Sequence, residues 1–179
     1  MLLLDGIVLG LLVGVLAGGS LKRFGAVRLK GEYLILPLLA FQLAVPRLAT
    51  ALGLPSRIAF VAWVAVMIGL VALALWNRRW LGLAIAAVGI ALNIVVIVAN
   101  GAMPVSLDAV ARLDSTVVPK FDLLHEPLTA ETRLEGLADI IPIPGPTWHR
   151  GVASVGDLLL FAGAGFFVFA AMREDSEAG

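Results

Sequence analysis

The chain has 179 residues, of which 60% are hydrophobic and only 15% are charged, and its formal net charge is zero. Soluble proteins contain roughly 45–50% apolar residues, so a water-soluble fold of this size could not bury this much apolar surface. The composition therefore predicts an integral membrane protein that is surrounded by the lipid bilayer. Cysteine is absent, which excludes disulfides, thiolate metal sites and a cysteine nucleophile. No block of basic residues indicates a nucleic-acid partner.

The hydrophobic residues are concentrated in segments long enough to cross a bilayer, which takes about 20 mostly apolar residues. The second segment is the least regular because it carries Pro37, Pro46 and Arg47, and the alternative there is a shorter span followed by an interfacial helix. The first lacks a positively charged start and an A-x-A-like cleavage site, so we expect a retained helix rather than a signal peptide. The expected spans are 2–19, 33–54, 58–76, 80–101 and 152–172.

The sequence thus predicts one all-α membrane domain, residues 1–179, in which about five spanning helices carry a long loop. Cytoplasmic loops are enriched in Lys and Arg. With five spans, the basic segments at 20–32 and 77–79 and the residue Arg173 fall on one side, whereas the short opposing loop holds only Arg57. We therefore expect the N-terminus outside the cell and the C-terminus in the cytoplasm.

Residues 102–151 form the long loop, which this orientation places outside the cytoplasm. Fifty residues are too many for a plain connection, and the loop has many Leu, Ile and Val residues. "SLDAVARL" and "TAETRLEGLADI" resemble short amphipathic helices that begin at Ser106 and Thr129, both suitable N-cap residues. We expect the loop to fold back as a lid over the ends of the helices.

Small residues mark the expected packing faces. Gly6, Gly10, Gly14 and Gly18 recur every four residues, which makes one face of the first helix smooth enough for close approach of another helix. The partner could be the last helix, where residues 162–165 are all Ala or Gly. A second protein or a second copy of the chain is the alternative.

The fourth span has a face that combines small residues with amides. Gly82, Ala86, Gly89, Asn93 and Asn100 recur at helical spacings, so they share a side of the helix. Small residues mark the packed side of a membrane helix, so both amides should point into the bundle. They could serve as hydrogen bonds between helices, or they could line a site.

Polar side chains of four spans are expected at similar depth near the outer ends: Asp5, Arg47, Asn100 and Asp157. Polar groups at membrane depth usually face a cavity or one another, so this set predicts a polar funnel that opens outward. Each charge also has a simpler explanation. Asp5 could be a solvated terminal residue, Arg47 could reach the headgroups, and Asp157 could form a capping box with Ser154. An Arg47–Asp157 ion pair would satisfy both charges.

The candidate ligand-binding set adds deeper residues and loop residues to this funnel. At 1.5 Å per helical residue, Gln42 and Asn93 lie about 7 and 10 Å deeper. His125 and His149 are 24 residues apart and lack the spacing of a metal site, and no cofactor or catalytic motif is present. The candidate binding residues are Gln42, Arg47, Asn93, Asn100, Met103, His125, Asp139 and Asp157.

Three stretches, "GGSLKRF", "NGAMPV" and "SVGDLLL", are similar to those of an uncharacterised bacterial family of small multi-spanning membrane proteins. That family has an N-G-x-M-P-V stretch after a late helix and an S-x-G-D stretch at the start of the last one. The resemblance runs from Gly18 to about Leu160. It implies a bacterial cell membrane location and this architecture. It implies no activity.

The residues favour binding or transport of a small polar or lipid-linked ligand in the outward-facing pocket. The alternative is an accessory or assembly subunit of a larger membrane complex. The small size of the chain and the glycine face suggest this alternative. A membrane enzyme acting on a lipid-linked substrate, with Asp139, Asp157 or His125 as acid or base, is the least supported hypothesis.

Overall fold

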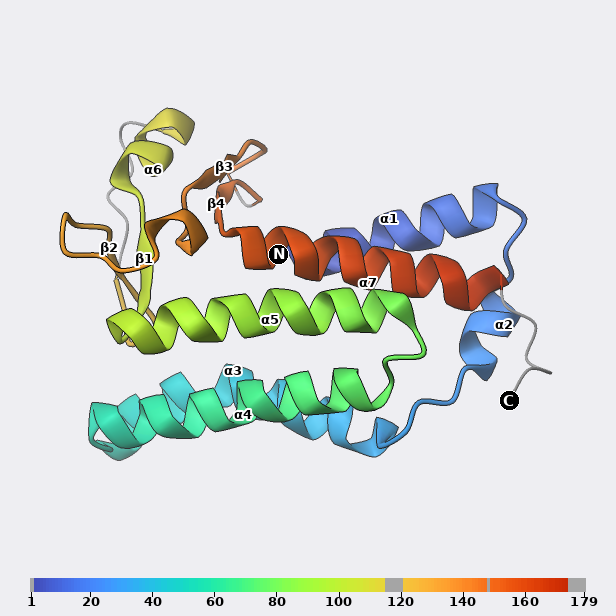
Figure 1. Ribbon diagram of the computed structural model, residues 1–179, viewed down its shortest axis with the longest axis horizontal. Coiled ribbons are helices and arrows are strands. Elements are labelled where there is room, and N and C mark those ends of the chain that lie inside the picture. Colours follow the sequence, from blue (N-terminus) through green and yellow to red (C-terminus); the bar gives the residue numbers. More distant parts are fainter. Residues whose placement is uncertain (1, 115–120, 148, 174–179) are drawn as a thin grey trace.

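The computed structural model describes residues 2–114, 121–147 and 149–173, and these are mostly helical (Figure 1). In chain order, the helices of these residues are α1 (Leu2–Leu16), α2 (Leu21–Ala26), the 3-10 helix η1 (Glu32–Leu34), α3 (Ile35–Leu52), α4 (Ser56–Trp76), α5 (Leu81–Asn100), α6 (Leu107–Leu113), the 3-10 helix η2 (Glu135–Leu137) and α7 (Val155–Arg173).

Among the described residues, four helical segments are long and apolar enough to cross a membrane. They are η1–α3, α4, α5 and α7, and their bounds differ from the expected spans by at most a few residues. The fifth expected span, α1, is a shorter apolar helix of 15 residues. The second span is a continuous helix with Pro46 in its interior.

The long helices form a row in which each packs mainly on the next, in the order α3, α4, α5, α7, α1. Figure 1 shows α3 and α4 as one layer, α5 beside α4, and α7 with α1 on the far side of α5. Gly6 and Gly10 of α1 face Phe161 and Gly165 of α7 in the same order, so these two helices run parallel. The row therefore alternates in direction up to α7.

The glycine face of α1 packs against α7 of the same chain. Gly6, Gly10 and Gly14 are buried, and a Cβ atom on any of them would lie less than 3.0 Å from an atom of α7. Gly18 does not belong to this face, because it lies in a turn with a φ of 79° and has nothing within 4 Å. The alternative in which this face recruits another chain is therefore not what the structure shows.

A second close contact joins α5 to α7. A Cβ atom on Gly82 would meet backbone atoms of Gly163 and Phe167, and one on Gly89 would meet the carbonyl of Gly156. Side chains of any size at these positions would push the helices apart. The prediction that the small residues of this span face the bundle is confirmed.

One helix was not predicted. The short α2 lies across the ends of the bundle, where the backbone N–H of Ser20 donates to the carbonyl of Met172 at 2.8 Å. Ser20 also caps α2, since its side chain accepts a hydrogen bond from the N–H of Lys22. Phe24 packs edge-on against Phe167 with 6.4 Å between ring centroids. The basic loop is thereby attached to the end of α7.

The loop between α5 and α7 lies at the opposite end (Figure 1), and it corrects the all-α expectation. Its described residues form two small sheets, in which β1 pairs with β2 in parallel and β3 pairs with β4 in antiparallel orientation. A bridge between Val105 and Asp139 links its two halves. The strands are β1 (Met103–Val105), β2 (His125–Pro127), β3 (Ile141–Ile143) and β4 (Gly151–Ala153).

The loop confirms one of its two predicted helices. Ser106 caps α6 by accepting a hydrogen bond from the N–H of Ala109. The helix predicted from Thr129 is wrong: Thr129 accepts from the N–H of Glu131 within a turn, and only the three-residue η2 follows. Residues 115–120 and 148 of the expected lid lie outside the described residues.

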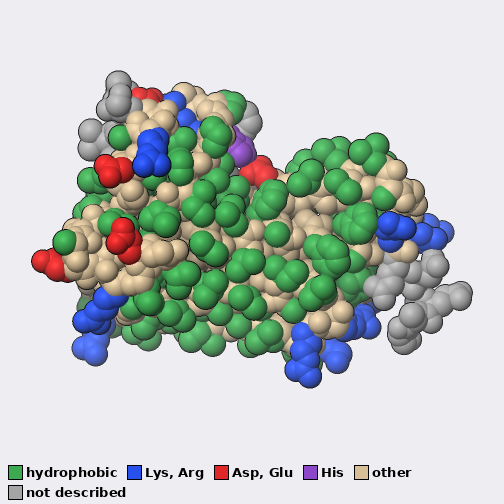
Figure 2. Space-filling model, turned by 45° about the horizontal axis from the view of Figure 1, so that its top comes forward, with side chains coloured by type: hydrophobic (Ala, Val, Ile, Leu, Met, Phe, Trp, Pro, Cys, Tyr) green, Lys and Arg blue, Asp and Glu red, His purple; other side chains and the backbone are tan. Residues whose placement is uncertain are grey.

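Most charged side chains lie toward the two ends of the molecule (Figure 2). Hydrophobic side chains dominate the surface between these ends. The elements that carry the basic cluster, namely α2, the turn from α4 to α5 and the end of α7, lie at the end opposite the loop (Figure 1). The residues of this cluster are Lys22, Arg23, Arg28, Lys30, Arg78, Arg79 and Arg173.

Candidate functional site

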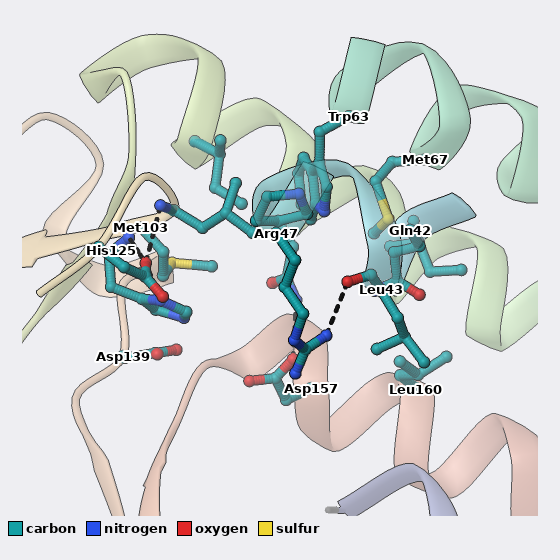
Figure 3. A pocket seen from close by; sticks show the side chains of 16 residues that line it. Gln42, Leu43, Arg47, Trp63, Met67, Met103, His125, Asp139, Asp157 and Leu160 are labelled. Carbon is teal, nitrogen blue, oxygen red and sulfur yellow. Dashed lines mark hydrogen bonds and ion pairs between the residues drawn. The ribbon is translucent and has the colours of Figure 1, made fainter. Parts of the chain in front are cut away.

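A cavity of about 560 Å³ lies beneath the loop, between α3, α4, α5 and α7. Seven of the eight predicted binding residues line it: Gln42, Arg47, Asn93, Met103, His125, Asp139 and Asp157. Figure 3 shows labelled side chains from α3, α4, α7 and the loop converging on one space, although these segments are far apart in the sequence. We call this space the loop pocket.

The wall formed by α7 begins with a capping box. The N–H of Asp157 donates to the Ser154 hydroxyl at 3.0 Å, and the N–H of Ser154 donates back to Asp157 Oδ2 at 3.2 Å. This reciprocal arrangement satisfies two backbone donors at the start of the helix. The predicted capping box is confirmed, and the capping carboxylate also lines the pocket.

Asn93 extends this box onto α5. Its amide nitrogen donates to Asp157 Oδ1 at 2.8 Å, and its amide oxygen accepts from the hydroxyl of the fully buried Ser154 at 2.9 Å. A Cβ atom on Gly156 would clash with this amide, so glycine there permits the close approach of Asn93. The amide thus joins two helices and fixes the carboxylate of Asp157 at the pocket.

Asp139 provides a second carboxylate from the loop. Its backbone is held on both sides, since its N–H donates to the carbonyl of Pro104 and its carbonyl accepts from the N–H of Ser106. The residue is only 8% exposed, and Oδ1 has no hydrogen-bond partner in the described part of the chain. Burial, together with the nearby charge of Asp157, raises the pKa of Asp139 to about 7.

The rim of the pocket carries a third acidic group, paired with a histidine. Asp122 Oδ1 lies 3.0 Å from His125 Nδ1 and accepts from the backbone N–H groups of Leu124 and His125. Partial burial raises the pKa of Asp122, but the hydrogen bonds from Leu124 and His125 outweigh that effect, so the pKa lies below its ordinary value. Asp122 is therefore an ionised, partnered carboxylate.

Arg47 is the cation of the opposite wall. Its side chain extends from α3 into the pocket (Figure 3), and it donates from Nη1 to the carbonyl of Leu43 at 2.8 Å. Arg47 and Asp157 form no ion pair within 4.0 Å in this structure, so the pairing that would satisfy both charges is absent. Both charged side chains line the same cavity.

Asn100 and Asp5, two members of the predicted funnel, do not line the pocket. The Asn100 side chain instead holds the loop, because it donates to the carbonyl of Arg133 and accepts from the N–H of Arg133. Asp5 lies next to Gly6, which is level with Phe161, and it bonds His149 Nε2 at 2.9 Å. Both residues attach the loop to the helices that support it.

Comparison with known proteins places the chain in a family. Residues 26–169 match the model of a family described as "Family of unknown function (DUF5317)". The chain belongs to this family. No curated protein and no solved structure matches it.

The DUF5317 match covers the whole pocket. It includes the "NGAMPV" and "SVGDLLL" stretches and all pocket-lining residues, whereas "GGSLKRF" and α1 precede it. The pocket residues that the sequence did not indicate include an aromatic and aliphatic group: Trp63, Met67, Ile90 and Leu160. They have no distinguishing pattern within apolar helices. The spacing "DLLH" could have indicated Asp122 as a partner of His125.

Proposed function

We propose that this DUF5317 member binds or transports a small polar or lipid-linked ligand in the loop pocket, which faces outside the cytoplasm. The observation that carries the proposal is the convergence of charged and amide side chains from α3, α5, α7 and the loop on one cavity. Ligand sites are typically about 300–1,000 Å³, largely apolar, with a few well-placed polar groups. The volume of about 560 Å³ and the lining fit that description.

Two acidic residues of the pocket are held in place by hydrogen bonds within the protein. Asp157 is held by Asn93 and Ser154, and the backbone of Asp139 is held by Pro104 and Ser106. Fixing polar groups before binding lowers the entropy cost of association. An apolar wall beside these groups would accommodate a chain or ring of the same ligand.

Ligand-dependent thermal stabilisation tests this proposal. The purified protein is screened against fractions of a lipid and metabolite extract, and the change in Tm is compared between variants. Arg47→Gln and Asp157→Asn should each lose the stabilisation, because both side chains line the pocket. Arg57→Gln is the matched control, since it removes an exposed charge that does not line the cavity. Stabilisation that survives in both pocket variants would refute the proposal.

The orientation can be tested separately because the chain has no cysteine. Single cysteines replace two exposed residues, Glu131 in the loop and Gly25 in α2, and intact cells are treated with a membrane-impermeant maleimide. We expect labelling of Glu131→Cys in intact cells and of Gly25→Cys only after permeabilisation. The reverse pattern would place the pocket on the cytoplasmic side.

A second candidate function, that of a subunit in a larger complex, is favoured by α3. This helix packs mainly on α4, and only 11% of its spanning window is buried. A partner would therefore bind along α3 rather than α1, whose glycines already contact α7. Replacing the exposed Phe41 and Leu48 of α3 with alanine should then release a second polypeptide after gentle extraction, and a chain that is always isolated alone would argue against this function.

A further inference from the structure

We propose that the ligand of the loop pocket carries a primary ammonium group, which donates hydrogen bonds to Asp139 and Asp157. This inference rests on the proposed function, because it names the chemical class that the same pocket would bind. The supporting observation is that Asp139 lines the pocket and that its buried Oδ1 accepts no hydrogen bond from the described residues.

Asp139 is the residue that requires a donor. Its side chain lines the pocket, the residue is more than nine-tenths buried, and Oδ1 has no hydrogen-bond partner in the part of the chain that the structure describes. Leaving a buried acceptor unsatisfied is costly, and the cost is larger for a charged group. An N–H donor that enters the pocket would remove that cost.

Asp157 provides the second half of the site. Its Oδ1 accepts from Asn93 and its Oδ2 accepts from the N–H of Ser154. A carboxylate has about four acceptor positions, so each oxygen retains capacity for another donor. Asp139 and Asp157 face the same cavity and interact electrostatically. A ligand with several N–H groups and a positive charge complements both carboxylates and screens their repulsion.

Each of the other charged side chains that line the pocket already has another partner. Asp122 and His125 are already bonded to each other at the rim, and the Arg47 guanidinium donates to Leu43 rather than to either carboxylate. A metal ion fits less well, because the described residues contain no group of three or more His, Cys, Asp or Glu that could hold one. An organic cation needs only the two carboxylates and room, which the cavity of about 560 Å³ provides.

A primary ammonium group differs from a quaternary one in a way that the pocket should detect. Both carry a positive charge, but only the primary group has N–H donors for Asp139 Oδ1. Hydrogen bonds to charged groups are strong enough to change affinity about tenfold or more. The buried Trp63 also lines the pocket, and aromatic faces attract quaternary ammonium groups, so the opposite preference would identify a different mode of binding.

The experiment compares ethanolamine with choline as soluble probes of the full chain, with apparent Kd taken from the dependence of Tm on probe concentration. We expect ethanolamine to bind at least about tenfold more tightly than choline. In a parallel arm, the protein is released from nanodiscs of phosphatidylethanolamine, phosphatidylcholine and phosphatidylglycerol in native mass spectrometry, and the lipid that stays bound is identified. Selective retention of phosphatidylethanolamine, with no response to free ethanolamine, would support the proposal and identify a lipid headgroup as the source of the ammonium group.

Two variants connect any response to the carboxylate. Asp139→Asn should abolish the preference for the primary amine, because it removes the charge from the buried acceptor. Asp108→Asn makes the same change on an exposed residue of α6, outside the pocket, and it should behave like the unmodified protein. Equal affinity for ethanolamine and choline, tighter binding of choline, or no amine binding in either arm would overturn the inference.

Failure of this inference can be distinguished from failure of the proposed function. If a molecule without an amine stabilises the protein, and Arg47→Gln and Asp157→Asn abolish that effect, the pocket binds a ligand of another class and only the ammonium assignment is wrong. If no extract fraction and no amine stabilises the protein, both are wrong.

Discussion

The titration of Asp139 predicts an unusual pH dependence of stability. The pKa of this carboxyl is raised from 3.8 to about 7 in the folded protein, so between these values the folded state binds a proton that the unfolded state releases. Stability from this group is complete below about pH 4 and is lost as the pH rises through about 7. This direction is opposite to that of a carboxylate stabilised by an ion pair.

The size of the effect follows from the same shift. At about 1.4 kcal/mol per pH unit, a rise of the pKa from 3.8 to about 7 corresponds to about 4 kcal/mol at most. The variant Asp139→Asn keeps the shape of the side chain without the charge, so it should be more stable than the unmodified protein at pH 8. For a chain of this length, about 2–4 °C of Tm per kcal/mol gives a difference on the order of 10 °C.

The assay measures Tm of both proteins in detergent from pH 5 to pH 9 in the absence of added amines. The other titratable and charged groups of the pocket, namely Asp157, Asp122, His125 and Arg47, are present in both proteins. Their direct contributions therefore largely cancel in the difference between the two curves. The difference should grow from pH 5 to about pH 7 in favour of Asp139→Asn and level off at higher pH. A difference that is constant with pH would refute the raised pKa of the buried Asp139.

Three further predictions concern packing and the attachment of the loop. Gly89→Ala should lower the free energy of unfolding by about 1–3 kcal/mol through overpacking against α7, whereas Gly25→Ala, which has open space around it, should not; equal Tm values would contradict the packing. Asn100→Ala should speed hydrogen exchange at the N–H of Arg133, whose acceptor it removes, and unchanged exchange would show that this contact does not hold the loop. Ser154→Ala should cost about 1 kcal/mol through loss of the cap, and its denaturation midpoint should shift accordingly.

The helices and their close contacts could be predicted because small residues recur at helical spacing. The face of Gly82, Gly89 and Asn93 on α5 follows from periodicity alone, and its burial against α7 needs only the rule that small residues mark packed faces. Counting residues from the membrane edge was also sufficient to place Arg47 and Asp157 at one cavity. These inferences depend on local geometry that the bilayer constrains.

The loop could not be predicted in the same way. The strands β1 and β2 each have three residues, and Met103 pairs with His125 across more than twenty residues, so no alternating pattern marks them. Asn100 shares a helical face with Asn93, which predicts a place in the pocket, but the loop brings Arg133 to its side chain. The outcome for such a residue depends on the path of a chain segment that has no periodic signal.

Native mass spectrometry of the gently extracted protein tests most directly the claim that the loop pocket holds a ligand. We predict one stoichiometric adduct per chain, with a mass and fragmentation that contain a primary amine, and we predict that Asp157→Asn loses it while Arg57→Gln retains it. A bare chain, or an adduct that both variants retain equally, would contradict the claim.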